Sequence, residues 1–227
     1  LEHMDTKRNN SDKYFHLLSD FYKYKYRNQH LDLIVACDDY AIEFLLDYGE
    51  SVFPNVPIVF GGANRVDISR IKANSNMTGV LEYADISKTI DLALTLQPET
   101  KELVVVNDAS ITGSFIGAEF RKILPTIDKK LKVTILEGMP LAEIEEKVSN
   151  LSSDAIVLLL VYVRDNTGEF YSPPLVASTI SRASKVPVYG VWDFYFHHGI
   201  VGGVMISGFL QGEGAAEIGN RVLSGED

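Results

Sequence analysis

The sequence predicts an α/β protein whose strands form parallel sheets. Short runs of β-branched and other apolar residues alternate along the chain with stretches in which apolar residues recur at helical spacing, the pattern of successive βαβ units. Most of these runs are apolar throughout, as strands covered on both faces require. A chain of 227 residues, 46% of them hydrophobic, is long enough for one large domain or for two smaller lobes.

Six strands are predicted, each bounded by turn residues or by the start of a helical pattern. They span residues 31–37, 56–62, 102–108, 132–138, 155–163 and 186–192. The longest apolar stretch, 155–163, is about half of the roughly 20 residues that a membrane-spanning helix needs. The sequence therefore predicts no transmembrane helix.

The predicted helices between these strands have recognisable boundaries. Pro140 suits the first turn of one helix. Apolar residues recur at helical spacing over 86–94, with Asp85 as the N-cap, and again over 116–124. We expect Pro125 to end the second of these patterns, because proline cannot donate a helical hydrogen bond.

Two crossovers divide the predicted elements into two lobes. The chain leaves the first set of strands near residues 79–84, through NMTGVLEYAD, and returns near 199–204, through the glycine-rich HHGIVGGVMISG. The sequence contains no internal repeat and no Gly/Ser linker. The lobes are therefore expected to be joined by short crossovers rather than by a flexible tether.

Composition excludes several classes of function. Lys and Arg number 21 against 31 for Asp and Glu, a net charge of −10, which repels a phosphate backbone, so no nucleic-acid partner is expected. The single cysteine, Cys37, excludes an intramolecular disulfide and a thiolate metal cluster. His197 and His198 are adjacent and cannot both bind one ion from a strand, so no metal site is predicted. No cofactor or catalytic motif is found: the glycine-rich 212–219 lacks dinucleotide-fingerprint spacing and favours the start of a helix.

Polar and aromatic residues follow the predicted strands. Because the carboxyl ends of parallel strands lie at one edge of a sheet, such residues face the crevice where α/β proteins bind ligands. The residues are Asp38, Asp39 and Tyr40; Gly61, Gly62, Ala63 and Asn64; Asn107, Asp108 and Ser110; Tyr162, Arg164 and Asp165; and Trp192, Asp193 and Phe194.

These residues also have a purely structural interpretation. Asp39, Asp108 and Asp193 suit helix caps and turns, although their repetition after several strands favours a site. Trp192 suits stacking on a flat ring while the Asp193 carboxylate holds an amine or hydroxyl. The alternative is a tryptophan that fills the core.

Three segments, in this order, resemble the ABC-transporter substrate-binding protein family with the type I periplasmic-binding fold. They are PIVFGGANRVD, NMTGVLEYADISKTIDLALTLQPETKELVVVND and VPVYGVWDFYFHHGIVGGVMISGFLQGEGAAEIGNRVLSGE. The resemblance covers residues 31–226. The start of the chain, LEHMDTKR with the following helix and LDLIVACDDYAIEFL, is similar to the branch found as extracytoplasmic sensor regions of bacterial histidine kinases.

The resemblance implies a non-enzymatic protein of two Rossmann-like lobes that closes on a small ligand. Lobe 1 would contain residues 1–83 and 201–227, and lobe 2 residues 84–200. The ligand-binding residues that the resemblance implies are Asp38, Asp39, Ala63, Asn64, Asn107, Asp108, Tyr162, Trp192 and Asp193.

Compared with the family, the chain begins after a first strand, helix and second strand. We therefore expect lobe 1 to be truncated at its N-terminus, with an exposed sheet edge that a second molecule could pair in a homodimer. We also expect any link to a membrane to lie in parts of a parent protein outside this sequence.

The function expected is an extracytoplasmic sensor domain that binds an amino acid, a sugar or a nucleobase-like molecule. The alternatives are a solute-binding component of an ABC transporter, an α/β enzyme that uses Asp39, Asp108 and Asp193, and the effector-binding domain of a transcription regulator.

Overall fold

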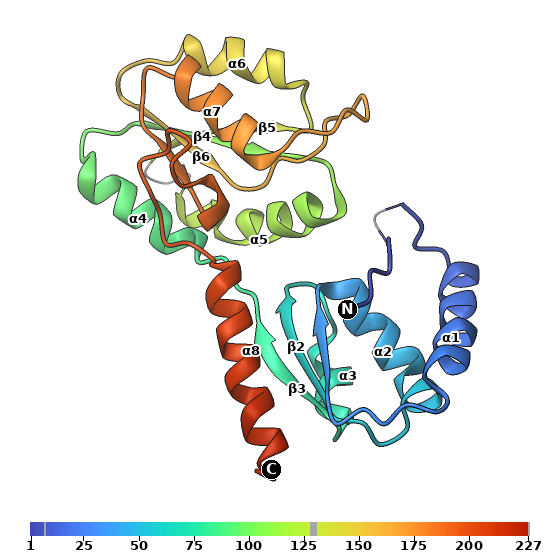
Figure 1. The fold of residues 1–227 in the computed structure, drawn as a ribbon. Helices are drawn as coiled ribbons and strands as arrows, with labels where there is room; N and C mark the ends of the chain where they lie inside the picture. The colour runs from blue at the N-terminus through green and yellow to red at the C-terminus, as the bar shows by residue number, and fades with distance from the viewer. Residues whose placement is uncertain (7, 128–130, 227) are drawn as a thin grey trace. The chain divides into compact units, whose positions relative to one another are not determined.

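The chain folds into two α/β units, each with its own parallel sheet (Figure 1). Unit 1 consists of Leu1–Tyr83 and Gly208–Asp227, and unit 2 of Ala84–Ser207. The computed structural model describes residues 1–6, 8–127 and 131–226. The two sets of parallel strands confirm the predicted fold class. Within the described residues, none of the helices combines the length and the apolar content that a bilayer span requires.

Unit 1 is a three-stranded sheet in the order β1-β2-β3 with helices on both faces. Its elements are α1 (Asp12–Tyr26), β1 (Ile34–Cys37), α2 (Asp39–Val52), β2 (Ile58–Ala63), α3 (Ile68–Ala73), β3 (Met77–Leu81) and α8 (Gly208–Leu223). Helix α2 packs against β1 and β2 and is covered by α1, while α8 packs against β2 and β3. Figure 1 shows α2 and α8 on opposite faces of this sheet.

The two faces of β2 are built differently. Ile58 and Phe60 point into a core with α2 residues such as Phe44, which follows from the alternation of side chains along a strand. On the other face, a Cβ at Gly61 would lie 3.5 Å from the backbone oxygen of Gln211 in α8. The small residue at this position therefore lets α8 lie close to the sheet.

Strand β3 is an element that the sequence analysis missed, because it treated this segment as part of a crossover. The run Met77–Leu81 contains Thr78 and Gly79 and so lacks the continuous apolar character of the other strands. Gly79 pairs with Phe60, and a Cβ at Gly79 would lie 2.2 Å from the Phe60 carbonyl oxygen. A glycine that weakens the sequence signal is thus the residue that permits the pairing.

Unit 2 is a four-stranded sheet in the order β5-β4-β6-β7. Its elements are α4 (Ile86–Leu96), β4 (Glu102–Asn107), α5 (Ile111–Ile127), β5 (Lys132–Glu137), α6 (Leu141–Ser149), β6 (Ala155–Leu159), α7 (Pro173–Ala183), β7 (Val188–Gly190) and the 3₁₀ helix η1 (Asp193–Tyr195). Figure 1 shows α6 and α7 on one face of this sheet and α4 and α5 on the other. The central strands β4 and β6 are buried almost completely, which explains why they are apolar throughout.

The predicted N-cap of α4 is confirmed, whereas the predicted effect of Pro125 is wrong. The Asp85 side chain accepts a hydrogen bond from the Lys88 backbone N–H. Pro125 lies inside α5, which continues to Ile127. Ile123 and Ile127 both pack against the core of unit 2, so apolar burial on either side of the proline offsets the missing hydrogen bond.

The return of the chain to unit 1 begins at Gly208 rather than near Val201. Residues 201–207 hydrogen-bond to the end of the sheet in unit 2: Val201 N–H donates to the Val188 carbonyl at 2.7 Å, and Gly190 N–H donates to the Gly202 carbonyl at 3.0 Å. The glycine-rich 212–219 lies inside α8.

Candidate functional site

The predicted site residues of each unit lie at the carboxyl edge of that unit's own sheet, because both sheets are parallel. In unit 1 they follow β1, end β2 or follow β2: Asp38, Asp39, Ala63 and Asn64. In unit 2 they end β4 or follow β4, β6 and β7: Asn107, Asp108, Tyr162, Trp192 and Asp193. The structure thus brings together the members of each set.

Asp39 connects the loop after β1 to the loop after β2. Its Oδ1 accepts hydrogen bonds from the backbone N–H groups of Asn64 at 3.1 Å and Arg65 at 3.0 Å, and its Oδ2 lies 3.8 Å from Arg65 Nε. Asp39 is buried, and this burial raises the pKa of its carboxyl, against the lowering effect of the two backbone hydrogen bonds. The carboxylate holds the loop of Asn64 in place.

Asp108 has the corresponding role in unit 2. Its Oδ2 accepts hydrogen bonds from the backbone N–H groups of Val163 at 2.7 Å and Arg164 at 3.1 Å. Its Oδ1 accepts from the Ser110 hydroxyl at 2.6 Å. A Cβ at Gly113 would lie 2.0 Å from Oδ1, so a glycine is needed at the start of α5. Both oxygens of this fully buried carboxylate are used within the protein.

Asp38 and Ala63 contribute to the same edge of unit 1 in different ways. The Asp38 side chain accepts from the Asp39 N–H at 2.9 Å and is exposed. Its φ of 75° is unusual for a residue with a side chain. Ala63 is buried and presents its backbone, with its carbonyl accepting from the Glu82 N–H at 2.8 Å.

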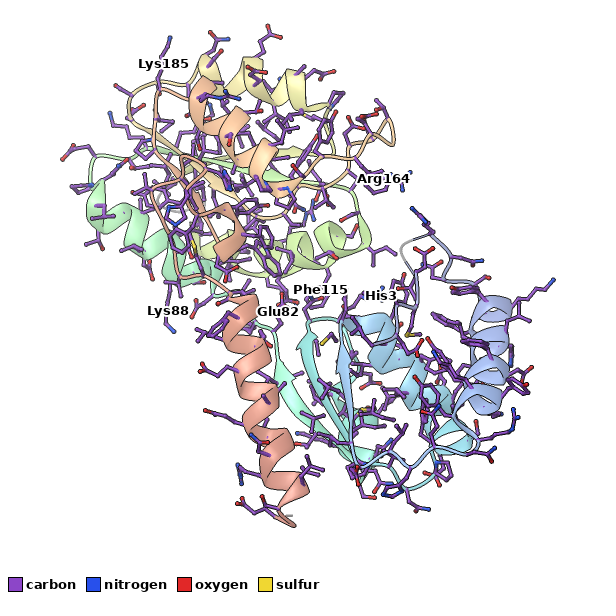
Figure 2. The ribbon with its side chains drawn as sticks, viewed as in Figure 1. His3, Glu82, Lys88, Phe115, Arg164 and Lys185 are labelled. Atoms are coloured by element: carbon purple, nitrogen blue, oxygen red, sulfur yellow. The ribbon has the colours of Figure 1, made fainter. Side chains whose placement is uncertain are left out.

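Glu82, which directly follows β3 (Figure 2), is a further candidate at this edge that sequence patterns did not reveal. Burial raises its pKa to about 7; the nearby Asp38 carboxylate adds to this shift, and a hydrogen bond from the Asn64 side chain opposes it. Glu82 Oε1 and Asn64 Oδ1 are both buried and have no hydrogen-bond partner among the described residues. Recognising MTGVL as a strand would have placed Glu82 at a strand end.

Two of the residues at the corresponding edge of unit 2 are part of the interior. Tyr162 is fully buried, its hydroxyl donates a hydrogen bond to the Met139 carbonyl, and burial raises its pKa. Asn107 is also buried, and its Nδ2 donates to the Gly113 carbonyl at 2.8 Å and to Glu137 Oε1 at 3.1 Å. Asn107 Oδ1 has no partner within the described part of the chain.

Trp192 and Asp193 follow β7. The Trp192 side chain is 8% exposed and stacks on the Phe194 ring, with ring centroids 5.3 Å apart. Its Nε1 is a buried donor without a partner among the residues described. Asp193, at the start of η1, is half-buried. The Trp192 ring therefore packs in the core, as the structural interpretation expects, while its one polar atom is unpaired among the described residues.

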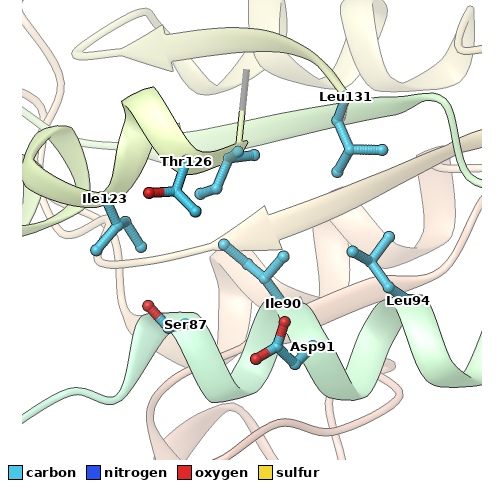
Figure 3. A pocket seen from close by; sticks show the side chains of 8 residues that line it. Ser87, Ile90, Asp91, Leu94, Ile123, Thr126 and Leu131 are labelled. Carbon is cyan, nitrogen blue, oxygen red and sulfur yellow. The ribbon is translucent and has the colours of Figure 1, made fainter. Parts of the chain in front are cut away.

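A separate pocket of unit 2 lies away from these residues. It has a volume of about 170 Å³ and lies between α4 and α5 (Figure 3). Leu94, Ile127 and Leu131 are among its lining residues. Because Ile127 at the end of α5 and Leu131 directly before β5 line it, the pocket is at the amino edge of the sheet, opposite the strand-end residues.

Among residues 1–6, 8–127 and 131–226, no group of three or more His, Cys, Asp or Glu side chains is arranged to hold a metal ion.

Comparison with known families identifies the chain. The model of the family "ABC transporter substrate binding protein" matches residues 4–227. The chain belongs to this family. A search of curated protein sequences found no significant match.

Solved structures with the same fold include other members of substrate-binding systems. A ligand-free, open substrate-binding protein with adhesive properties from Clostridium difficile is 17% identical, with a TM-score of 0.63; the match covers 94% of this chain and 70% of that one. An ABC domain from Streptococcus pneumoniae in complex with L-Trp is 20% identical, with a TM-score of 0.58; the match covers 93% and 70%.

The fold alone does not identify a function. A LacI family transcriptional regulator from Bifidobacterium animalis is 16% identical, with a TM-score of 0.59 over 96% of this chain and 78% of that one. At such identities the likeness shows a shared fold. The match to the family model, and not the fold, is what assigns this chain to the substrate-binding family.

Proposed function

We propose that this chain binds a small organic molecule with residues at the carboxyl ends of its two sheets. The match to a substrate-binding family over residues 4–227 is the observation that carries this proposal. Buried polar atoms without partners support it, because such atoms are nearly always hydrogen-bonded in a complete structure. Among the described residues these atoms include Asn64 Oδ1, Glu82 Oε1, Asn107 Oδ1 and Trp192 Nε1.

The proposal assigns different roles to the predicted site residues. Asn64, Trp192 and Asp193 would contact the ligand. Asp39 and Asp108 would instead hold the loops after neighbouring strands, since Asp39 Oδ1 and Asp108 Oδ2 each accept hydrogen bonds from two backbone N–H groups. At Asp108 this role also disfavours the enzyme hypothesis, because both of its oxygens already accept hydrogen bonds and a proton-transferring carboxylate needs a free oxygen to reach the substrate.

Trp192 provides the test, because it is the single tryptophan in the sequence. We expect titration with the ligand to change its intrinsic fluorescence and to raise the unfolding temperature. A ligand at 100 times its dissociation constant adds about 2.7 kcal/mol of stability. Amino acids would be screened first, since the pneumococcal neighbour was crystallised with L-Trp, followed by sugars and nucleosides.

Variants would then connect binding to the strand ends. Trp192→Phe keeps an aromatic ring but removes the unpaired donor, and Asp193→Asn removes a charge. Both should weaken binding, whereas Asp91→Asn on the exposed surface of α4 should not. Binding that survives in both site variants would contradict the proposed placement, and the absence of binding across all classes would contradict the function.

Within this function we propose a role outside the cytoplasm. Solute delivery to an ABC transporter is the role that the family description supports. Sensing for a histidine kinase is a second candidate that rests on the resemblance of the N-terminal segment. In the source bacterium, loss of solute uptake after deletion of the gene would favour delivery, and loss of a solute-dependent transcriptional response with normal uptake would favour sensing.

A homodimer through the sheet of unit 1 remains a prediction. Within the described residues β1 pairs only with β2, which leaves one edge of β1 open for pairing. Sedimentation equilibrium would test it: a monomer at all concentrations contradicts the homodimer.

A further inference from the structure

The carboxyl edge of the sheet in unit 1 carries several negative charges. Asp38 follows β1, Asp39 begins α2, and Glu82 follows β3. The Asp38 and Asp39 carboxylates are close enough to raise the pKa of Glu82. Arg65, the cation that pairs within this group, already contacts Asp39 and lies 3.3 Å from the carboxylate of Glu43.

Glu82 and Asn64 each have an oxygen without a hydrogen-bond donor among the described residues, which distinguishes them from Asp39. Asp39 receives two backbone N–H groups, whereas Glu82 Oε1 and Asn64 Oδ1 are buried without a donor in the described structure. Both unpaired atoms are acceptors. A buried acceptor without a donor costs about 1–3 kcal/mol, so the group that completes this edge must be a hydrogen-bond donor.

There is no side chain at Gly62 to cover the Glu82 carboxylate. Gly62 has a φ of 71°, which favours glycine, and a Cβ there would lie 3.6 Å from Glu82 Oε2 and from Asp38 N. Its own N–H donates instead to Gln211 Oε1 of α8, at 3.2 Å. Glycine at this position therefore leaves the carboxylate without an intervening side chain.

The sign of the surrounding charge decides which donor fits. A neutral hydroxyl or amide could satisfy the two acceptors, but it would leave the mutual repulsion of Asp38, Asp39 and Glu82 unchanged. A positively charged nitrogen satisfies the acceptors and also offsets that repulsion. A carboxylate or phosphate would add to the repulsion and is disfavoured at this edge.

We propose that Glu82 and Asn64 are the specificity-determining residues of unit 1 and accept hydrogen bonds from a positively charged nitrogen of the ligand, an ammonium or guanidinium group. This inference rests on the proposed function and adds the chemical class of the ligand. The inference favours amines and amino acids as ligands over sugars and nucleosides, whereas the sequence alone favoured none of these classes.

The test uses the whole chain and matched probes. Common amino acids, polyamines and aromatic amines would each be compared with their N-acetylated forms at pH 8, by thermal shift and then by isothermal titration. The same measurements would be made with compounds that lack a positively charged amine: sugars, nucleosides, dicarboxylates and calcium chloride. We expect binding by one or more free amines and a loss of at least about tenfold in affinity on N-acetylation, the equivalent of one charge-assisted hydrogen bond.

Glu82→Gln is the informative variant, because it keeps the shape of the side chain and removes its charge. We expect it to weaken amine binding by at least about tenfold. Glu50→Gln, on the exposed end of α2, makes the same change in net charge and should leave binding unchanged. Urea unfolding of both variants would verify that they are folded.

The pH dependence gives a second readout. Asp38, Asp39 and the Asn64 amide surround the Glu82 carboxyl, whose pKa is raised to about 7; Arg65 and Glu43 lie beyond Asp39. Amine affinity in the unmodified chain should therefore rise between pH 6 and pH 8, as Glu82 loses its proton. The rise should be smaller in Glu82→Gln.

The outcomes separate this inference from the proposed function. Binding by sugars, nucleosides, dicarboxylates or calcium alone, or amine binding that Glu82→Gln does not change, would overturn the inference and leave ligand binding intact. The absence of binding by every class would overturn both.

Discussion

The Glu82 carboxyl connects the stability of unit 1 to pH. Its pKa is raised from 4.5 to about 7, chiefly by burial, so the folded state favours the protonated form. The resulting penalty is absent below about pH 4.5, grows as the pH rises to about 7 and is constant above that. Glu82→Gln removes the penalty.

We therefore expect Glu82→Gln to be more stable than the unmodified chain at pH 8 and nearly equal to it at pH 4.5. Urea unfolding at both pH values measures the difference. Glu50→Gln should show no such pH-dependent gain. Equal stabilisation of Glu82→Gln at both pH values would contradict the shifted pKa.

Asp108 permits a second prediction at this scale. Asp108→Asn presents an N–H₂ group where the carboxylate accepts hydrogen bonds. Either the Val163 N–H, which donates to Oδ2, or the Ser110 N–H, which donates to Oδ1 at 3.0 Å, then loses its partner. We expect a loss of about 1–3 kcal/mol in the free energy of unfolding, measured by urea denaturation. The surface variant Asp91→Asn should change it by less than about 0.5 kcal/mol. A neutral Asp108→Asn would show that these hydrogen bonds are dispensable.

Sequence patterns predicted which residues lie at the strand ends. They did not predict which of these side chains are exposed and which are buried by hydrogen bonds within the protein. Asp38 and Asp39 are neighbours with identical chemistry, yet one is exposed and the other buried. The difference arises because the N–H groups of Asn64 and Arg65, 25 and 26 positions along the chain, reach Asp39 only after β1 and β2 have paired. Such contacts between distant residues have no local signature.

Among the elements, β3 depends most clearly on one residue. Gly79→Ala would place a Cβ against the backbone of Phe60, so the strand must move or unpair. We expect a loss of about 1–3 kcal/mol, measured by chemical unfolding. Gly212→Ala is the matched control: its Cβ meets nothing within 4 Å, and alanine should stabilise the interior of α8 by roughly 0.5–1 kcal/mol. If both substitutions stabilise, β3 does not require the glycine.

The elements that the sequence predicted well are those with an unbroken apolar signal. Strands β4 and β6 are central and covered on both faces, and the turn chemistry at Asp85 fixes the start of α4. Element ends were less predictable: the apolar run beginning at Ala155 continues to residue 163, but pairing with β4 ends at Leu159. Apolar residues beyond that point are buried in loops, which hydrophobicity alone does not distinguish from a strand.

At the scale of the whole molecule, the two units differ in whether they are built from one continuous segment of the chain or from two. Unit 2 is a single segment, and its core, which includes Leu103, Phe120 and Ile156, lies entirely within it. Unit 1 needs two segments, because α8 covers β2 and β3. We expect residues 84–207 alone to unfold cooperatively in urea, and residues 1–83 alone to lack a cooperative transition. The opposite result would show that the core clusters do not define the folding units.

The hydrogen bond from Gly62 to Gln211 spans 149 positions, and this has a consequence for biosynthesis. While a ribosome makes the chain, α8 emerges only after the whole of unit 2, so the β2 and β3 surface that it covers stays uncovered until that unit has been made. Unit 2, by contrast, can collapse as soon as its continuous segment has emerged. A chaperone that binds nascent chains should therefore contact the residue 58–81 region for longer than any strand of unit 2, and premature termination before Gly208 should yield a polypeptide with one finished half and one aggregation-prone half.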